Sequence, residues 1–480
     1  MTNSRIKFFI DQHGCAKNQT DAELIAGFLV KKGLEHTLNP DEADYILINS
    51  CGFINSAKKE SIDAVYRASK NYPDAKIILT GCLAERYSDE LFESIPELKG
   101  VFGNGNLSEI ADFIEACEKK RSKKIYEQKG ICEGERPVLY GFKGSAYVKI
   151  TEGCSNHCSF CAIPLIRGEL RSRKAINIVQ EIKTLVENGV YEINLIGQDI
   201  AAYGTGLEDE NLFKETALEN NKYNRKLENC SSGTSALSLL LKLIGQIKGD
   251  YIIRLLYIHP DHFNFDIIDA IRKDKRIVHY FDIPFQSGDD EIIRAMNRKG
   301  TKKSYETFIS ELQKEIPDMV LRTTFLTGFP GETENAFNNS KDFLQNIKPH
   351  WSGTFPYSRE EDTPAYSLKN KVSSKIAVQR SRILEEEQMK ITSDKLKGYE
   401  GQTLRVLVEE VFQSEKDNSE DFEGLAIGRA WFQAPDVDGA VVIRFDAEDE
   451  QHIREGNVVT VKIISCTGVD LDSRFIYHRN

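Results

Sequence analysis

Three cysteines, Cys154, Cys158 and Cys161, stand close together in the stretch TEGCSNHCSFC. Three thiolates are one short of a closed tetrahedral zinc site, and His157 in the same stretch is a candidate fourth ligand. Three thiolates can instead hold three corners of a [4Fe–4S] cluster and leave the fourth iron open. An open iron can bind the amine and carboxylate of an amino-acid group and place a sulfonium beside the cluster for one-electron reduction. The compact spacing favours the cluster, because structural zinc sites usually add a second, distant pair of ligands.

A second set of cysteines, Cys15, Cys51 and Cys82, is spread over the first part of the chain. Each one follows an apolar run that predicts a buried strand, in IKFFIDQHGC, DYILINSC and AKIILTGC. In a parallel sheet the carboxyl ends of such strands meet at one edge, where these sheets build their sites. We therefore predict that the three thiols share a second cluster. The alternative is three unrelated core cysteines, which are common in proteins.

Other residues near these cysteines or at predicted strand ends are candidates for binding a cofactor. An acid that follows the first cysteine group also has an ordinary explanation as a helix cap, and a polar pair at a strand end can simply form a turn. The full set of cofactor candidates is Phe160, Arg167, Gly168, Glu169, Gln198, Asp199, Gln286 and Arg322. The residues interpreted as incidental or structural are Cys117, Cys132, Cys230, Cys466, His259 and His262.

The chain has 480 residues, ten cysteines and a net charge of −11. Its first residues lack a sustained apolar region, and no apolar run is long enough to span a membrane, so we predict a cytoplasmic protein without membrane contact. In a reducing compartment, clustered cysteines are metal or redox ligands rather than disulfide partners. The acidic balance disfavours unspecific attraction to a phosphate backbone.

The pattern of apolar runs divides the chain into three parts. Short buried strands first alternate with amphipathic helices, which predicts a parallel sheet covered on both faces. The alternation resumes in a longer series suited to a full or partial (β/α) barrel, which the polar residues 207–236 interrupt as a surface excursion. Short strands with turn glycines then predict a small antiparallel barrel. The predicted boundaries are 1–125 for the N-terminal domain, 126–139 for a linker, 140–375 for the central domain, 376–397 for a helical connection and 398–480 for the barrel.

The cysteine stretches carry a family resemblance. CSNHCSFC is similar to the C-x3-C-x-aromatic-C motif of the radical S-adenosylmethionine (SAM) superfamily. HGCAKNQTDAE, INSCGFINSAKKES and LTGCLAERY resemble the N-terminal domain of the methylthiotransferases, and the likeness extends through the chain to a TRAM-like barrel at its end. The resemblance implies two [4Fe–4S] clusters, one that generates a 5′-deoxyadenosyl radical and one that delivers sulfur. It also implies SAM as radical source and methyl donor, and a sulfur donor and an electron donor as partners.

The methylthiotransferases divide into a branch that modifies adenosine in tRNA and a branch that modifies an aspartate of small-subunit ribosomal protein twelve. GCAKN is closer to the GCxKN form of the second branch than to the GCQMN form of the first. Gln198-Asp199 and the DIPFQ form also favour the ribosomal-protein branch, whereas Ser287-Gly288 is the form of the tRNA branch. The resemblance therefore implies methylthiolation of an aspartate β-carbon in that ribosomal protein, with a tRNA adenosine methylthiotransferase as the alternative.

The charge of the C-terminal segment is a separate argument about the partner. Residues 401–480 hold eight basic and sixteen acidic residues, a net charge of −8. An RNA-binding surface is expected to be basic, whereas an acidic barrel suits a basic ribosomal protein. A solvated acidic face is the alternative, and RNA is the less favoured partner. Trp431 and Phe432 are candidates for substrate contact, with burial in a core as the other explanation.

Overall fold

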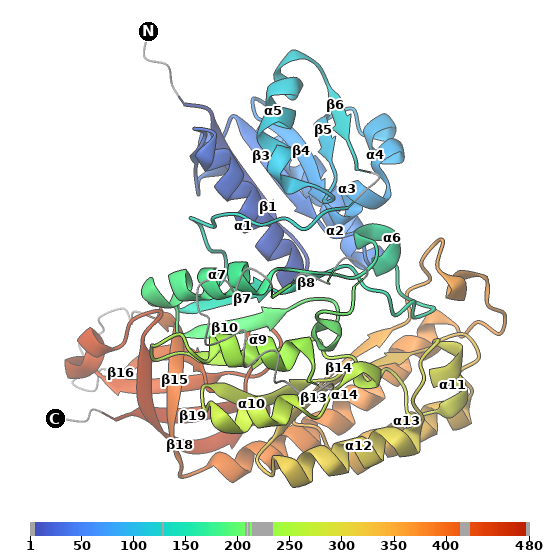
Figure 1. Ribbon diagram of the computed structural model, residues 1–480, viewed down its shortest axis with the longest axis vertical. Helices are drawn as coiled ribbons and strands as arrows, with labels where there is room; N and C mark the ends of the chain where they lie inside the picture. The colour runs from blue at the N-terminus through green and yellow to red at the C-terminus, as the bar shows by residue number, and fades with distance from the viewer. Residues whose placement is uncertain are drawn as a thin grey trace.

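The structure is a computed structural model that describes residues 5–126, 129–206, 209, 212–213, 234–412 and 423–476. It contains an N-terminal α/β unit, a central α/β unit and a C-terminal barrel, which follow one another from blue to red in Figure 1. Most of the excursion predicted at 207–236, with Cys230, lies outside the described residues. None of the helices within the described ranges is both long enough and apolar enough to cross a membrane.

The N-terminal unit is a six-stranded parallel sheet in the order β2-β1-β3-β4-β5-β6, as the sequence predicts. Helices α1 and α5 pack on one face and α2 and α4 on the other, so the central strand β3 is buried along its whole length. The sequence pattern did not predict β6, a short edge strand of sequence SKK that no apolar alternation marks. The elements are β1 (Lys7–Gln12), α1 (Ala16–Lys31), β2 (Glu35–His36), β3 (Tyr45–Ser50), α2 (Asn55–Asn71), β4 (Lys76–Gly81), α3 (Cys82–Arg86), α4 (Ser88–Ser94), β5 (Leu98–Phe102), α5 (Ile110–Lys119) and β6 (Ser122–Lys124).

The central unit is a six-stranded parallel sheet in the order β14-β13-β12-β11-β10-β7. Strands β7 and β14 stay at its edges, so the expected (β/α) barrel is a partial one. Helices α7, α9, α10, α12 and α13 pack on one face of the sheet, and the long helix α14 packs along β14. The elements are β7 (Ser145–Lys149), β8 (Thr151–Glu152), α6 (Ile163–Arg167), β9 (Arg171–Ser172), α7 (Ala175–Glu187), β10 (Glu192–Ile196), α9 (Ala236–Ile244), β11 (Ile252–Leu255), α10 (Ile267–Lys273), β12 (Ile277–Asp282), α11 (Asp290–Ala295), α12 (Lys302–Glu315), β13 (Val320–Thr327), α13 (Glu334–Ile347), β14 (Trp351–Pro356) and α14 (Ser374–Leu396).

The C-terminal unit is a closed barrel in which neighbouring strands follow the order β15-β16-β17-β19-β18. The neighbouring pairs are antiparallel, as the sequence predicts, except β17 and β19, which run parallel. The strands are β15 (Thr403–Phe412), β16 (Glu423–Arg429), β17 (Val441–Asp446), β18 (Val458–Thr467) and β19 (Asp470–Phe475).

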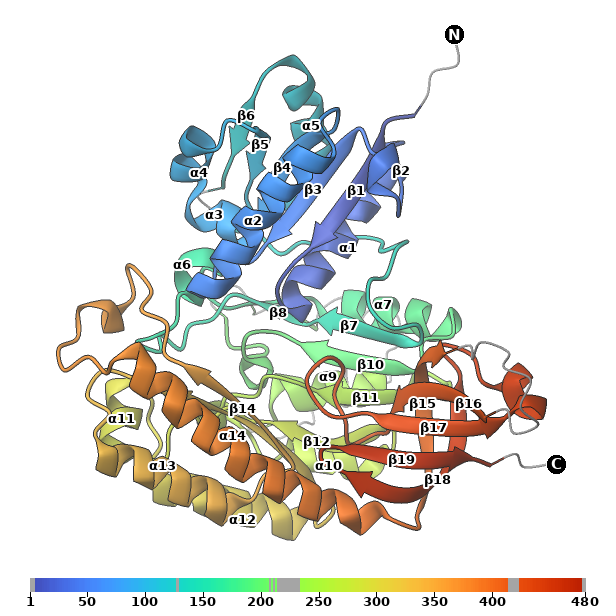
Figure 2. The ribbon, with the colours of Figure 1, turned by 180° about the vertical axis from the view of Figure 1, so that it is seen from behind.

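The barrel packs against the face of the central sheet that the helices leave open (Figure 2). Tyr147, Tyr280 and Trp351 of that sheet share one apolar core with the barrel. The loop between β16 and β17 supplies Phe432, which is fully buried and whose carbonyl oxygen accepts a hydrogen bond of 2.8 Å from Trp351 Nε1. Trp431 packs against the same core and is half-buried. Both aromatic residues therefore belong to an interdomain core, and the structure gives no support to their role in substrate contact.

A buried carboxylate, Glu192 in β10, ties the barrel to the central sheet. It pairs with Arg254 at 2.8 Å and with Arg429 of the barrel at 2.6 Å. Burial opposes the charge on Glu192, but the two guanidinium groups outweigh it and hold the pKa of the carboxyl well below its usual range. Charge pairing therefore adds to apolar packing in fixing the barrel on the sheet.

Candidate active site

The three N-terminal cysteines converge at the carboxyl edge of the first sheet. Cys15, Cys51 and Cys82 follow three neighbouring strands, β1, β3 and β4. Gly14 allows two of these segments to approach closely, because its φ is +90° and a Cβ there would lie 2.9 Å from the Cβ of Cys51. Cys82 is buried, Cys51 is half-buried and Cys15 is exposed, so this cysteine group opens toward solvent at Cys15.

Replacing Gly14 with alanine is expected to displace Cys51 and to lower the iron content of the protein. The new Cβ would collide with Cys51 and would also impose backbone strain. Gly33→Ala is the matched control, since Gly33 has a φ of +99° but open space around it, and its substitution carries only the strain of about 1–2 kcal/mol. Iron and sulfide analysis of both purified variants checks this prediction. Full iron in Gly14→Ala would contradict it.

The other three cysteines lie between β8 and α6 in the central unit. The backbone N–H of Cys154 donates to the carbonyl oxygen of Gly168 over 3.0 Å, and that of Cys161 donates to the carbonyl oxygen of Cys158 over 2.9 Å. These bonds fold the segment back on itself, so that the three thiols are close enough to influence one another electrostatically. The compact motif therefore forms one cysteine group, as its spacing predicts.

Burial makes four thiols of the two groups poor free nucleophiles, because it disfavours the thiolate form. Burial, with a smaller contribution from neighbouring thiols, raises the pKa of Cys51 to about 12. Burial also raises the pKa of Cys154 to about 11, and it raises the pKa values of Cys82 and Cys161 as well. Such thiols stay protonated at neutral pH until a metal displaces the protons. Metal loading is therefore expected to release protons at both groups.

Among the described residues, neither cysteine group brings its three sulfur atoms within 4.8 Å of one another, as a single metal ion would need. Asp199, His259 and His262 form a group of possible ligand atoms within 4.8 Å of one another, and no cysteine of the described residues joins such a group. A tetrahedral zinc ion would hold its thiolates at about 2.3 Å, which places them roughly 4 Å apart, whereas a cubane cluster binds each thiolate to a separate iron. His157, the candidate zinc ligand, faces Glu169 at 3.5 Å. The donor sets therefore fit iron–sulfur clusters.

Segments of the two cysteine groups meet at the boundary between the first two units. Cys82 packs against Ala162 and Ile166, which follow Cys161 in the chain. Helix α3, which begins at Cys82, contacts α6. At the end of α6, Arg167 donates a hydrogen bond of 3.3 Å to Sγ of Cys82. Helix α6, which follows the central cysteine group, therefore supports the N-terminal cysteine group.

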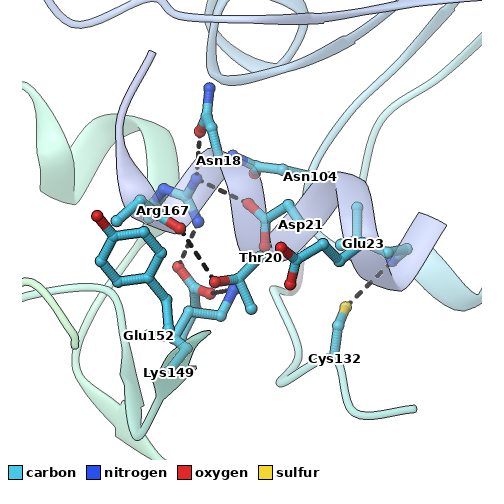
Figure 3. A network of polar contacts seen from close by, with 12 residues as sticks. Asn18, Thr20, Asp21, Glu23, Asn104, Cys132, Lys149, Glu152 and Arg167 are labelled. Carbon is cyan, nitrogen blue, oxygen red and sulfur yellow. Dashed lines mark hydrogen bonds and ion pairs between the residues drawn. The ribbon is translucent and has the colours of Figure 1, made fainter. Parts of the chain in front are cut away.

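Arg167 lies in a buried ion-pair network at this boundary, which Figure 3 shows from close by. Its guanidinium pairs with Asp21 at 2.8 Å and with Glu152 at 2.7 Å. Lys149 pairs with the same two carboxylates. Asn18 accepts a further bond of 2.7 Å from Arg167. All five side chains are buried, and the two positive charges balance the two negative ones, so the network joins α1 to the central unit without a net charge.

A second polar cluster lies beside the central cysteine group. Asp199, just after β10, accepts a bond of 3.0 Å from Asn156 and lies 2.6 Å from Nδ1 of His262. Burial opposes ionisation of Asp199, but the hydrogen bonds from His262 and Asn156 and the charges of the two histidines together outweigh burial and lower the pKa of the carboxyl. Nε2 of His259 lies 3.9 Å from Sγ of Cys158. The sequence analysis interpreted both histidines as structural. Their position shortly after β11 indicates that they lie at the carboxyl edge of the central sheet.

A cavity of about 800 Å³ lies where the first two units meet. Phe160 from the central cysteine segment, Phe53 from the segment after Cys51 and Gln286 from the edge of the central sheet line it. Gln286 holds a φ of +72°, a strained conformation for a residue with a side chain. The cavity therefore lies beside segments of both cysteine groups.

The remaining cofactor candidates lie in different surroundings. Neither amide atom of Gln198 has a hydrogen-bond partner among the described residues, so this side chain is free to bind a ligand. Gly168 and Glu169 lie beside the central cysteine segment, as the bond from Cys154 to Gly168 shows. Arg322 in β13 instead pairs with Asp438 of the barrel. Cofactor binding by the eight candidates stays a prediction.

The sequence analysis did not single out Lys17 and Asn18, which follow Cys15. Asn18 is fully buried and joins three segments, since its amide donates to Ser50 over 2.8 Å and accepts from Cys82 over 3.1 Å. Lys17 is also buried, with its ammonium 2.9 Å from the centre of the Tyr257 ring. The sequence does carry a signal for both residues: they are polar and lie in the first turn of a helix that begins directly after Cys15.

Comparison with known families agrees with this architecture. Residues 7–103 match an uncharacterized protein family, UPF0004, residues 148–344 match the radical SAM superfamily and residues 401–476 match the TRAM domain. The fold resembles that of the radical SAM methyltransferase TsrM from Kitasatospora setae, with a TM-score of 0.51 and 14% identity over 75% of each chain. At this identity the likeness concerns the fold alone. Fold and cysteine motif define a radical SAM enzyme, a class that implies a [4Fe–4S] cluster and SAM.

Relatives of known class match the chain from end to end. The chain is 50% identical to the ribosomal protein uS12 methylthiotransferase RimO of Treponema denticola, over 97% of this chain and 99% of that protein. It is 35% identical to the protein of the same name from Carboxydothermus hydrogenoformans, over 98% and 100% of the two chains. The corresponding protein of Aquifex aeolicus is 36% identical over 96% and 95%. The chain therefore belongs to the family of the ribosomal protein uS12 methylthiotransferases RimO, as its motifs suggest.

Proposed function

We propose that this chain transfers a methylthio group to ribosomal protein uS12. Family membership supports the proposal. The structural observation that carries it is that Cys82 of one cysteine group packs against Ala162, the residue after Cys161 of the other. Two adjacent centres can divide radical formation from sulfur delivery, which a single centre cannot do.

Each cysteine group would hold one [4Fe–4S] cluster. Cys154, Cys158 and Cys161 would bind the cluster that works with SAM, and Cys15, Cys51 and Cys82 would bind the second, sulfur-delivering one. When bound, the first cluster and SAM supply a 5′-deoxyadenosyl radical that removes hydrogen from an unactivated carbon. The residues proposed to contact SAM or to orient such contacts are Phe160, Arg167, Gly168, Glu169, Gln198, Asp199, Gln286 and Arg322.

The residues of the chain hold these centres in place and keep water away. Arg167 donates to Cys82 and, through Asp21 and Glu152, fixes the two units relative to each other. The aromatic side chains of Phe53 and Phe160 line the cavity at the boundary. Apolar walls exclude water from a reactive intermediate and so suppress side reactions.

The substrate group would be an aspartate of uS12, modified at its β-carbon. The side chain of that aspartate is negatively charged, although uS12 as a whole is expected to be basic. The acidic segment 401–480 would attract such a protein by electrostatic complementarity. A sulfur donor and an electron donor complete the reaction as further partners.

A reconstituted reaction tests the proposal. The purified protein with its clusters is incubated with SAM, a reductant, sulfide and purified uS12, and the mass of uS12 is measured. We expect the addition of one methylthio group that fragmentation maps to an aspartate. A parallel incubation with tRNA tests the alternative substrate. Modified adenosine in tRNA together with unmodified uS12 would overturn the proposal.

A further inference from the structure

Lys17 is a buried cation close to where the two cysteine groups meet. It lies in the first turn of α1, two residues after Cys15, and only 8% of its surface is exposed. Its ammonium reaches across the unit boundary to the ring of Tyr257, which follows β11. The charge therefore stands above the carboxyl edge of the central sheet, on the side that carries the cysteine motif.

Among the described residues, the ammonium of Lys17 contacts the ring of Tyr257 and pairs with no carboxylate. Within the described part of the chain, it takes part in no hydrogen bond and has no carboxylate within 4.0 Å. The group whose negative charge would influence it most is the thiolate of Cys15, two residues before it, which the N-terminal cluster would engage. The two carboxylates whose charge reaches it are engaged by other groups: Asp282 accepts from the N–H of Tyr257 over 3.1 Å, and Glu152 pairs with Arg167. A buried charge without an anion costs free energy unless something else compensates it.

The other buried cations at this boundary are paired. Arg167 and Lys149 both bind Asp21, and Arg136 binds Glu23. Within the described ranges, the chain thus supplies carboxylates to these three buried cations and none to Lys17. Cys15, two residues before it, is exposed to solvent.

We propose that Lys17 binds the carboxylate of the substrate aspartate between the two cysteine groups. This inference rests on the proposed function, which brings an aspartate side chain of uS12 to this place. A charge-assisted hydrogen bond in a buried site is strong and directional. Because the carboxylate is bonded directly to the β-carbon, holding it at Lys17 also holds the reacting carbon. The positive charge selects an aspartate over an asparagine of the same shape.

The test compares two substrates and three enzymes, all loaded with their clusters. The substrates are uS12 and a uS12 variant in which asparagine replaces the modified aspartate, and the enzymes are the wild type, Lys17→Met and Lys31→Met. Lys31 is the matched control, since it is an exposed lysine at the far end of α1. Binding of each substrate is measured by titration, together with iron content, visible absorption and SAM cleavage in the absence of uS12.

We expect the wild type and Lys31→Met to bind the aspartate form roughly 10- to 100-fold more tightly than the asparagine form. Lys17→Met, compared at the same iron content as the wild type, is expected to bind both forms equally weakly. Discrimination by Lys17→Met equal to that of the wild type would overturn the inference. Equal binding of both substrates by the wild type would also overturn it, whatever the variant does. Failure of the wild type to modify uS12 would instead overturn the proposed function.

Discussion

Cys51→Ala is expected to abolish methylthiolation of uS12 while the enzyme still cleaves SAM. Cys51 belongs to the N-terminal cysteine group, to which we assign sulfur delivery, and alanine leaves that group with two thiols. Radical formation depends on the other group, in the central unit, which this substitution does not touch. One reaction mixture reports both outcomes, as 5′-deoxyadenosine formed and as methylthiolated uS12.

A buried cysteine of the same unit, outside the cysteine group, provides the control for this experiment. Cys117 lies in the apolar core between α5 and the sheet, outside both cysteine groups. Cys117→Ala removes the same atoms and is expected to keep methylthiolation. If Cys51→Ala methylthiolates uS12 at the wild-type rate, sulfur does not come from the N-terminal group.

Arg167→Met is expected to lower the free energy of unfolding by about 3–5 kcal/mol. The guanidinium is the shared partner of Asp21 and Glu152, and its loss leaves two buried carboxylates with only Lys149 to balance them. The substitution also removes the donor to Cys82. We therefore expect the second cluster to be lost at a lower urea concentration than in the wild type.

Urea unfolding of the cluster-loaded protein measures this effect. Arg272→Met is the control, because Arg272 also pairs with a carboxylate, Glu315, but both side chains are about half exposed. Exposed pairs contribute about 0–1 kcal/mol, so this variant is expected to unfold close to the wild type. A loss below about 1 kcal/mol in Arg167→Met would contradict the importance assigned to the buried network.

The convergence of the N-terminal cysteines could be predicted because it depends on local sequence. Apolar runs before Cys15, Cys51 and Cys82 fix three strands, and parallel pairing brings the ends of those strands to one edge. The three-part fold is confirmed for the same reason, since the spacing of apolar residues determines which elements form. Strand β6 was missed because its three polar residues join the sheet only through backbone bonds.

Features that depend on how the units dock could not be predicted. The sequence around Arg167 gives no sign that Asp21, far away in the chain, would approach it, and the structure turns this arginine toward Cys82. Phe432 became a core residue because the partial central barrel leaves one face open for the C-terminal barrel. Contacts of this kind arise from packing between units, which the apolar pattern of one segment does not encode.

The mass of uS12 from cells with and without this gene tests the central claim most directly. We predict that uS12 from cells with the gene carries one methylthio group on an aspartate and that uS12 from cells without the gene lacks it. An identical mass of uS12 in both strains would contradict the account, and tRNA nucleosides would then be compared between the same strains.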